Sequence, residues 1–382
     1  MKNILPALFA FIIFFLSCNS ITNFNYYTGL KIFKDFDSSR TFDTTSLKAP
    51  MHYKPVRIDL FYPSDEKPVK PALIYGDIMD MYEQRMDYYT SIDSCKKVST
   101  QLAKMFAEYL HVDSASKLLN IKTEIFKDLE LPSKKFPLVI YASSMNGSSW
   151  ENPFLYDSLA HHGYVVAVIS SVGKFPGYMS GATDMEEQVN DILYAIKKMK
   201  SFDFIDANKI GLLSWSLGGT AIAKAAMISA DVKCLLSYDG TEIHYFGFDT
   251  AWDAQYKQIM QIPPYKPEAI TVPYMYLSSE HPKKIDSVYV FPNFISSKEK
   301  YFVKFIDAIH ENFSSLPVLA KTADTALKNI DSGRSEIIIK LTTTFFDQYL
   351  KQSNTASTKT IIDKLVADKP GFVSTDYPTS PR

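Results

Sequence analysis

Apolar and polar residues alternate along the chain in two distinct patterns. Short, continuously apolar runs are typical of strands buried on both faces of a sheet. Such strands are expected at 138–141, 164–169, 209–213, 232–238, 272–277 and 301–305. Segments with apolar residues three or four positions apart predict helices at 154–162, 183–199, 220–229 and 336–350. This alternation predicts an α/β fold: a mostly parallel central sheet covered by helices on both faces.

The pattern is less regular on either side of this region. Residues 56–62 alternate and stop at Pro63, which predicts a strand and a turn. Residues 65–133 are interpreted as an insertion, with helical spacing over 102–119. The last residues, 352–382, are polar and are expected to form a loose tail with a weak helix at 360–366. We therefore assign residues 29–351 to one domain, with a tether at 18–28.

The first residues are predicted to be a leader. Lys2 precedes an apolar stretch at 4–16, which is shorter than the roughly 20 residues needed to span a bilayer. Residues 1–17 therefore fit a signal peptide. Phe15-Leu16-Ser17-Cys18 resembles the lipobox of bacterial lipoproteins, although Phe15 replaces the usual leucine. The resemblance implies a lipid on Cys18 that anchors an exported protein to the bacterial cell envelope; plain secretion or an uncleaved anchor are the alternatives.

Composition excludes some partners. The formal net charge is −1, which gives no long-range field to attract nucleic acid, and no basic cluster reverses this. Besides Cys18, the chain contains Cys95 and Cys234. Cys234 lies in an apolar run, so two free thiols are favoured over a disulfide. The absence of CxxC and HExxH motifs gives no reason to expect a metal or another cofactor.

The segment from Ser214 to Gly218 joins an expected buried strand to an expected helix. This is the context of a nucleophile elbow, written G-x-S-x-G, in which a sharp turn exposes a serine hydroxyl. Here Ser216 is the candidate nucleophile, and Ser214 replaces the first glycine. The alternative is a small-residue strand–helix junction without catalysis.

A serine becomes a good nucleophile when a histidine takes its proton and an acid orients that histidine. In this fold the three residues follow one another in the order serine, acid, histidine. Asp239 comes at the end of the next strand, and His310 follows the strand at 301–305. Glu280 is the rival acid. The predicted triad is therefore Ser216, Asp239 and His310.

These residues also carry a family resemblance. The stretch 136–313 resembles the α/β-hydrolases of the platelet-activating-factor acetylhydrolase type, also called group-VII phospholipases A2. The acid follows the first strand after the elbow, and His310 is followed by a polar residue, Asn312 and Phe313. Two further shared features are the Ser279-Glu280 pair and the strand that ends at Tyr62-Pro63-Ser64.

The resemblance implies an α/β-hydrolase fold and a serine esterase that cleaves carboxylic esters of short acyl chains, on small molecules or lipids, through an acyl-enzyme. It implies that the backbone N–H groups of Met145 and Leu217 form the oxyanion hole. Ser143-Ser144 depart from the family's His-Gly at that loop. Two alternatives stay open: a catalytically degenerate surface lipoprotein that binds a glycan or lipid, and a dienelactone-hydrolase-like or peptidase-like enzyme with Glu280 as its acid.

Overall fold

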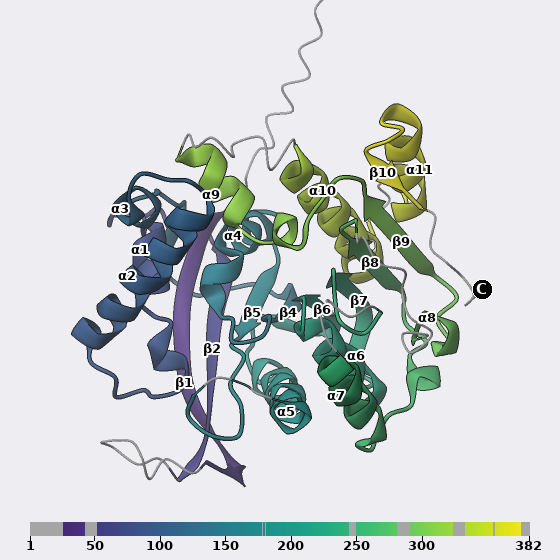
Figure 1. Ribbon diagram of the computed structural model, residues 1–382, viewed down its shortest axis with the longest axis horizontal. Helices are drawn as coiled ribbons and strands as arrows, with labels where there is room; N and C mark the ends of the chain where they lie inside the picture. The colour runs from purple at the N-terminus through teal and green to yellow at the C-terminus, as the bar shows by residue number, and fades with distance from the viewer. Residues whose placement is uncertain are drawn as a thin grey trace, which may run out of the picture.

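The computed structural model describes residues 26–42, 52–177, 179, 181–243, 250–280, 291–323, 333–353 and 356–375. Their strands form one sheet in the order β10-β9-β8-β7-β6-β4-β5-β2-β1-β3 (Figure 1). The strands are β1 (Tyr27–Thr41), β2 (Tyr53–Ser64), β3 (Ile125–Lys127), β4 (Phe136–Ala142), β5 (Val165–Ile169), β6 (Ile205–Trp215), β7 (Val232–Tyr238), β8 (Tyr274–Ser278), β9 (Lys300–Phe305) and β10 (Val373–Ser374). The central strands from β5 to β9 are parallel, and β2 and β10 join them antiparallel.

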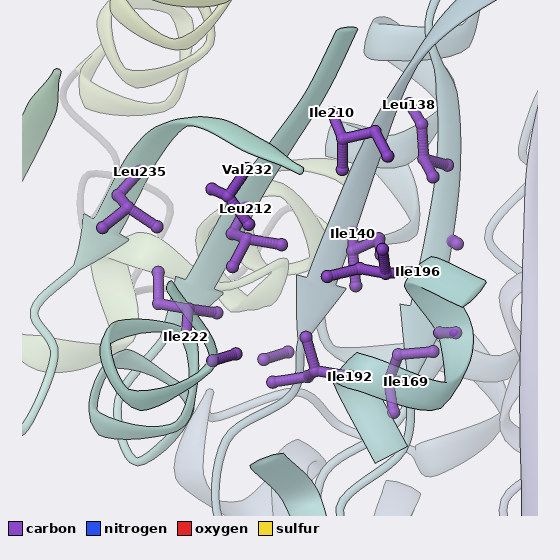
Figure 2. Packing of buried hydrophobic residues seen from close by; sticks show 14 of the residues in the cluster. Leu138, Ile140, Ile169, Ile192, Ile196, Ile210, Leu212, Ile222, Val232 and Leu235 are labelled. Atoms are coloured by element: carbon purple, nitrogen blue, oxygen red, sulfur yellow. The ribbon is translucent and has the colours of Figure 1, made fainter. Parts of the chain in front are cut away.

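Helices cover both faces of the sheet, because successive strand residues point to opposite sides. In β4, Leu138 and Ile140 face one apolar core, and Val139 and Tyr141 face the other. The first core is closed by α5 (Ala182–Met199), α6 (Gly218–Ile228) and α7 (Thr250–Gln261). Figure 2 shows Ile196 of α5 beside Ile140 of β4. The second core is closed by α4 (Pro153–His161), α10 (Arg334–Phe346) and α11 (Thr358–Asp368). The predicted fold class is confirmed.

The predicted insertion is mainly helical and forms a third apolar cluster. Its elements are α1 (Tyr75–Met79), η1 (Glu83–Arg85), α2 (Ile92–Tyr109), α3 (Ala115–Leu119) and the edge strand β3. Apolar side chains of α1, α2 and α3 pack against α9 (Leu316–Thr322), which follows the candidate histidine in the chain. Further short elements include η3 (Pro267–Ala269), α8 (Phe291–Phe294) and the π-helical turn η6 (Asp347–Lys351).

Both ends of the domain extend further than the sequence predicted. Strand β1 begins at Tyr27, inside the expected tether. The helix expected at 360–366 is confirmed as α11, but the tail after Gln352 is not loose over the described residues. Helix α11 buries Ile362 in the second core, and Val373 of β10 pairs with Phe305 of β9. Few apolar residues are needed for these contacts, because β10 is only two residues long.

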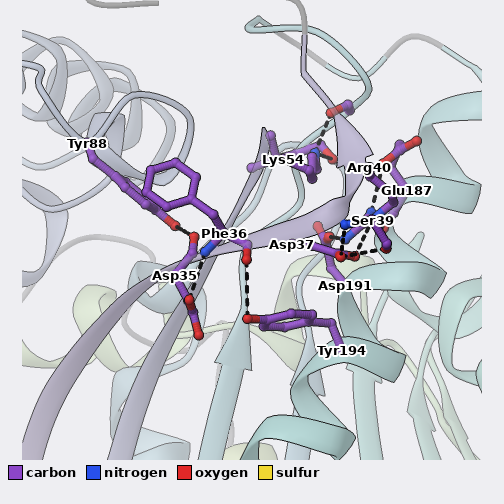
Figure 3. Close-up of polar contacts among 12 residues, drawn as sticks. Asp35, Phe36, Asp37, Ser39, Arg40, Lys54, Tyr88, Glu187, Asp191 and Tyr194 are labelled. Atoms are coloured by element: carbon purple, nitrogen blue, oxygen red, sulfur yellow. Dashed lines mark hydrogen bonds and ion pairs between the residues drawn. The ribbon is translucent and has the colours of Figure 1, made fainter. Parts of the chain in front are cut away.

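A buried polar cluster ties the long β1–β2 hairpin to the rest of the domain (Figure 3). The Arg40 guanidinium lies 2.7 Å from Asp37, 2.7 Å from Glu187 and 2.5 Å from Asp191, the last two on α5. The adjacent Lys54 ammonium is fully buried and donates to the carbonyls of Val172 and Gly173. The charges are therefore satisfied, and the chain that follows β5 is held in place.

Cys95 and Cys234 are both buried and free, as predicted. Burial raises the pKa of the Cys234 thiol well above its usual value. Among the residues described, no helix combines the length and the apolar character needed to cross a bilayer.

The role of α11 can be tested by stability. Replacing the buried Ile362 with alanine is expected to lower the free energy of unfolding by about 2–4 kcal/mol, because it leaves a cavity in the second core. The matched control is Lys364→Ala on the exposed side of the same helix, expected to change it by less than about 0.5 kcal/mol. Urea unfolding that gave equal midpoints for both variants would contradict the packing of α11.

Candidate active site

Ser216 lies in a sharp turn between β6 and α6. Its φ is +59°, in the left-handed region that non-glycine residues rarely adopt. The turn is held by hydrogen bonds at both ends: the Ser216 N–H donates to the Tyr238 carbonyl at 3.0 Å, and the Ser216 carbonyl accepts from Gly219 and Thr241. The Ser216 side chain is half-buried, so it is reachable from solvent. This is the geometry of a nucleophile elbow.

The residues flanking the turn must be small because backbones approach each other closely there. A Cβ on Gly218 would collide with the carbonyl oxygen of Ala142 at the end of β4. Ser214 is fully buried, and its neighbours across the sheet are Ala142 and Ser237. Small residues on both adjacent strands therefore accommodate serine where the motif usually has glycine.

Asp239 follows β7 directly and is fully buried. Its Oδ2 lies 2.8 Å from His310 Nδ1. The backbone N–H and the hydroxyl of Ser279 donate to the same carboxylate at 2.9 and 2.7 Å. An ionised carboxylate only accepts hydrogen bonds, so the contact with His310 assigns the imidazole proton to Nδ1. The nitrogen Nε2 is then the one with a lone pair for proton transfer.

His310 begins the short helix η4 (His310–Phe313) and stands beside the residue that precedes the serine. The Trp215 and His310 rings are stacked, with centroids 4.9 Å apart. The Trp215 indole N–H also donates to the His310 carbonyl at 3.2 Å. The structure therefore brings His310 and Asp239 together next to Ser216.

Glu280, the rival acid, is placed differently. Its side chain is exposed, and its carboxylate accepts a hydrogen bond from the Asp307 N–H at 2.8 Å. The geometry thus favours Asp239 as the partner of His310. His161 and His162 lie at the end of α4, and both have ring nitrogens bonded to carbonyls of their own helix.

The loop after β4, residues 143–147, is the predicted site of one oxyanion donor. Gln188 donates to the Ser143 carbonyl at 2.7 Å, and Tyr82 donates to the Asn146 carbonyl at 2.8 Å. Asn146 carries the positive φ of this loop, so Ser143 and Ser144 are not strained. Their departure from His-Gly is accommodated without a glycine.

Two backbone N–H groups, one in this loop and one in the elbow, are available as hydrogen-bond donors. Across the described ranges, neither the Met145 nor the Leu217 N–H has a hydrogen-bond partner. A Cβ on Gly218 would collide with the Ala142 carbonyl oxygen and come within 3.0 Å of the Ser143 carbonyl oxygen, so the two donors lie on adjacent segments. Free N–H groups on neighbouring segments can bind an anionic oxygen.

The residues that hold these groups in place were not identified from the sequence. Gln188 and Tyr82 come from α5 and the insertion, and no local motif marks either. Glu151, at the end of η2 (Ser149–Glu151), is bonded to the 143–147 loop, and burial raises its pKa to about 8. Cys18 lies outside the described residues. Within the described ranges, no three His, Cys, Asp or Glu side chains are arranged to hold a metal ion.

Comparisons with known proteins agree with the observed fold. No family model matches the chain. A ferulic acid esterase from Streptomyces cinnamoneus has a TM-score of 0.59 at 14% identity, covering 88% of this chain and 93% of that one. An acylaminoacyl peptidase from Pyrococcus horikoshii has a TM-score of 0.42 at 16% identity, covering 61% and 40%. The chain has the α/β-hydrolase fold.

Dipeptidyl peptidases 8 of Homo sapiens and Mus musculus are also similar in sequence. Dipeptidyl peptidase 8 of Homo sapiens is 28% identical over 141 residues, which are 33% of this chain and 15% of that protein. The chain thus matches only a small part of this relative's length.

The close approach of backbones at the elbow predicts that adding one methyl group at Gly218 destabilises the protein. Gly218→Ala is expected to destabilise the protein by about 1–3 kcal/mol, because the Cβ must displace the end of β4. Gly181→Ala is the control: at that position a Cβ would have no neighbour within 4 Å. Thermal unfolding that showed equal effects for both variants would contradict the close contact.

Proposed function

We propose that this protein is a serine hydrolase that cleaves carboxylic esters through an acyl-enzyme, with Ser216, Asp239 and His310 as its catalytic triad. The observation that carries the proposal is the 2.8 Å contact between Asp239 and His310, placed beside a serine held in the left-handed conformation. A junction with only a structural role would give no reason for this contact and this serine conformation to occur side by side.

In the proposed reaction His310 Nε2 takes the proton of the Ser216 hydroxyl as Oγ attacks the ester carbonyl carbon. The buried Asp239 carboxylate stabilises the imidazolium that forms. The carbonyl oxygen becomes an oxyanion, which accepts hydrogen bonds from the Met145 and Leu217 N–H groups; each such donor is worth about 10²–10³ in rate. The imidazolium then gives its proton to the leaving alcohol, and water releases the acyl group by the same steps.

Short acyl esters are the proposed substrate class, on small molecules or lipids. The resemblance to the platelet-activating-factor acetylhydrolase type supports this, and a structural neighbour that covers 88% of this chain is named as an esterase. The insertion contributes Tyr82 to the loop that carries Met145, so it stands close enough to influence which acyl group is accepted.

Peptide cleavage is the second candidate, favoured by the sequence match to dipeptidyl peptidase 8. An amide would use the same triad and oxyanion donors. Parallel assays with p-nitrophenyl acetate and dipeptide p-nitroanilides separate the two candidates.

The triad is tested first by covalent labelling. A fluorophosphonate probe is expected to modify Ser216 in the protein comprising residues 19–382, with the adduct located by peptide mapping. Ser216→Ala should abolish labelling and ester hydrolysis. Asp239→Asn should lower kcat by about 10⁴, because it loses the charge that holds the imidazole in its working tautomer.

Glu280→Gln is the matched control, and its kcat should stay within about threefold of wild type because the side chain is exposed. Retained activity in Asp239→Asn with loss in Glu280→Gln would instead assign the acid to Glu280. Well-folded protein that never reacts with the probe would overturn the proposal in favour of a ligand-binding lipoprotein.

We also propose that Cys18 carries a lipid that anchors the protein to the cell envelope, with the membrane as its partner. In a bacterial host, the full chain should incorporate radiolabelled palmitate and fractionate with membranes, whereas Cys18→Ser should do neither. Equal labelling of both chains would overturn this anchor.

A further inference from the structure

Glu151 is a buried carboxyl group beside the candidate site, and the proposed reaction gives it no role. It is 1% exposed and belongs to η2, eight residues after Ser143. Across the described residues it forms no ion pair with a cation, and its neighbours are serine and tyrosine groups. Its carboxyl oxygens lie 3.1 Å from the Ser144 backbone nitrogen, which donates to them, and the Ser144 hydroxyl donates to Oε1.

The hydrogen bond from the Ser144 N–H matters because Met145 is the next residue in the chain. The peptide plane of Ser144 is fixed by this bond, and the adjoining peptide carries the Met145 N–H. Gly147 packs directly on the Glu151 carboxyl, where a Cβ would collide with it. Glu151 therefore holds the loop on both sides of Met145.

Glu151 and its neighbour Asn152 also form hydrogen bonds with the residues at the end of η4, the short helix that begins at His310. The Ser315 N–H donates to the Glu151 carbonyl at 2.7 Å, and Asn152 Nδ2 donates to the Phe313 carbonyl at 3.0 Å. Asn152 Nδ2 and the Tyr141 hydroxyl are also bonded, and that hydroxyl donates to Glu151 Oε2 at 3.3 Å. One network thus connects the 143–147 loop with the end of η4.

We propose that Glu151 is the positioning residue of the oxyanion hole, fixing the direction of the Met145 N–H through the Ser144 peptide. This inference rests on the proposed function, because it assumes that Met145 binds the oxyanion. A buried carboxyl without a cation is costly to keep, so its retention in this loop calls for such a role. Burial raises the pKa of Glu151 to about 8, which agrees with this confined environment.

The test replaces Glu151 with glutamine, which keeps the size but replaces one carboxyl oxygen, an acceptor in both the protonated and the ionised form, with an NH₂ group that only donates. The single-turnover acylation rate with p-nitrophenyl acetate should fall about 10–100-fold, as for other outer residues that orient a reacting group. The substrate concentration at half saturation should stay within about threefold. The control is Glu336→Gln, whose side chain is 80% exposed, with both values unchanged.

A tetrahedral inhibitor separates positioning from general damage. A trifluoromethyl ketone adds to Ser216 and places its oxyanion in the hole, so its Ki should rise in Glu151→Gln by the same factor as the acylation rate falls. If Ki is unchanged, or if the variant acylates like wild type, the inference fails and the triad stands. If wild type hydrolyses no ester or amide, the proposed function itself fails.

The dependence of Tm on pH compares the stability of the folded glutamine variant with that of wild type. The titratable groups facing Glu151 are the phenols of Tyr141, Tyr156 and Tyr75, whose pKa values are raised by burial. Native Glu151 keeps its proton up to pH about 8, whereas the unfolded chain releases it near pH 4.5. The stability of wild type therefore falls relative to that of the Glu151→Gln variant as the pH rises between these values. The Tm of the variant minus the Tm of wild type should increase from pH 5 to pH 8.

Should Glu151→Gln not fold, Ser144→Ala provides the second variant. It removes only the hydroxyl that donates to Glu151 and leaves in place the hydrogen bond from the Ser144 backbone N–H to the carboxyl. Acylation should slow about fivefold, the equivalent of one hydrogen bond. Acylation as fast as wild type in this variant would overturn the inference.

Discussion

The parallel pairing of β6 with β7 is the interaction on which the candidate site depends. Trp215 is in register with Tyr238, and the Ser216 N–H continues the ladder by donating to the Tyr238 carbonyl. Because the strands are parallel, both chains leave the sheet at the same edge, and Ser216 and Asp239 emerge side by side. Both residues adopt positive φ values there. The pairing thus makes Ser216 and Asp239 neighbours in space although they are far apart in the chain. His310, which follows β9, lies beside them.

The central part of this arrangement could be predicted from the sequence because it rests on local patterns. Continuous apolar runs such as that of β7 identify buried strands, and the order serine, acid, histidine follows from the topology of such a sheet. Ser216, Asp239 and His310 each end or follow a strand, so their convergence needs only the strand order. Met145, on the loop after β4, was assigned by the family resemblance and not by this topology.

The supports of the site could not be predicted in this way. Gln188 and Tyr82 bond to backbone carbonyls of the 143–147 loop, and a backbone carbonyl leaves no trace in the sequence. Glu151 looks like a surface residue, since acidic side chains are rarely fully buried. The tail was misjudged for a related reason: α11 contributes Ile362 to the core, but the segment as a whole is polar.

The separate apolar cluster of the insertion has a consequence for how this fold can diversify. Its members pack on one another and on α9, whereas Ile78 of α1 and Ile125 of β3 belong to the second core, and Trp150 packs against both clusters. Substitutions in distant, independent clusters combine additively, whereas those in shared contacts do not. Helices α2 and α3 contribute to this cluster alone, so they can change in sequence with little effect on the strands that position Ser216, Asp239 and His310.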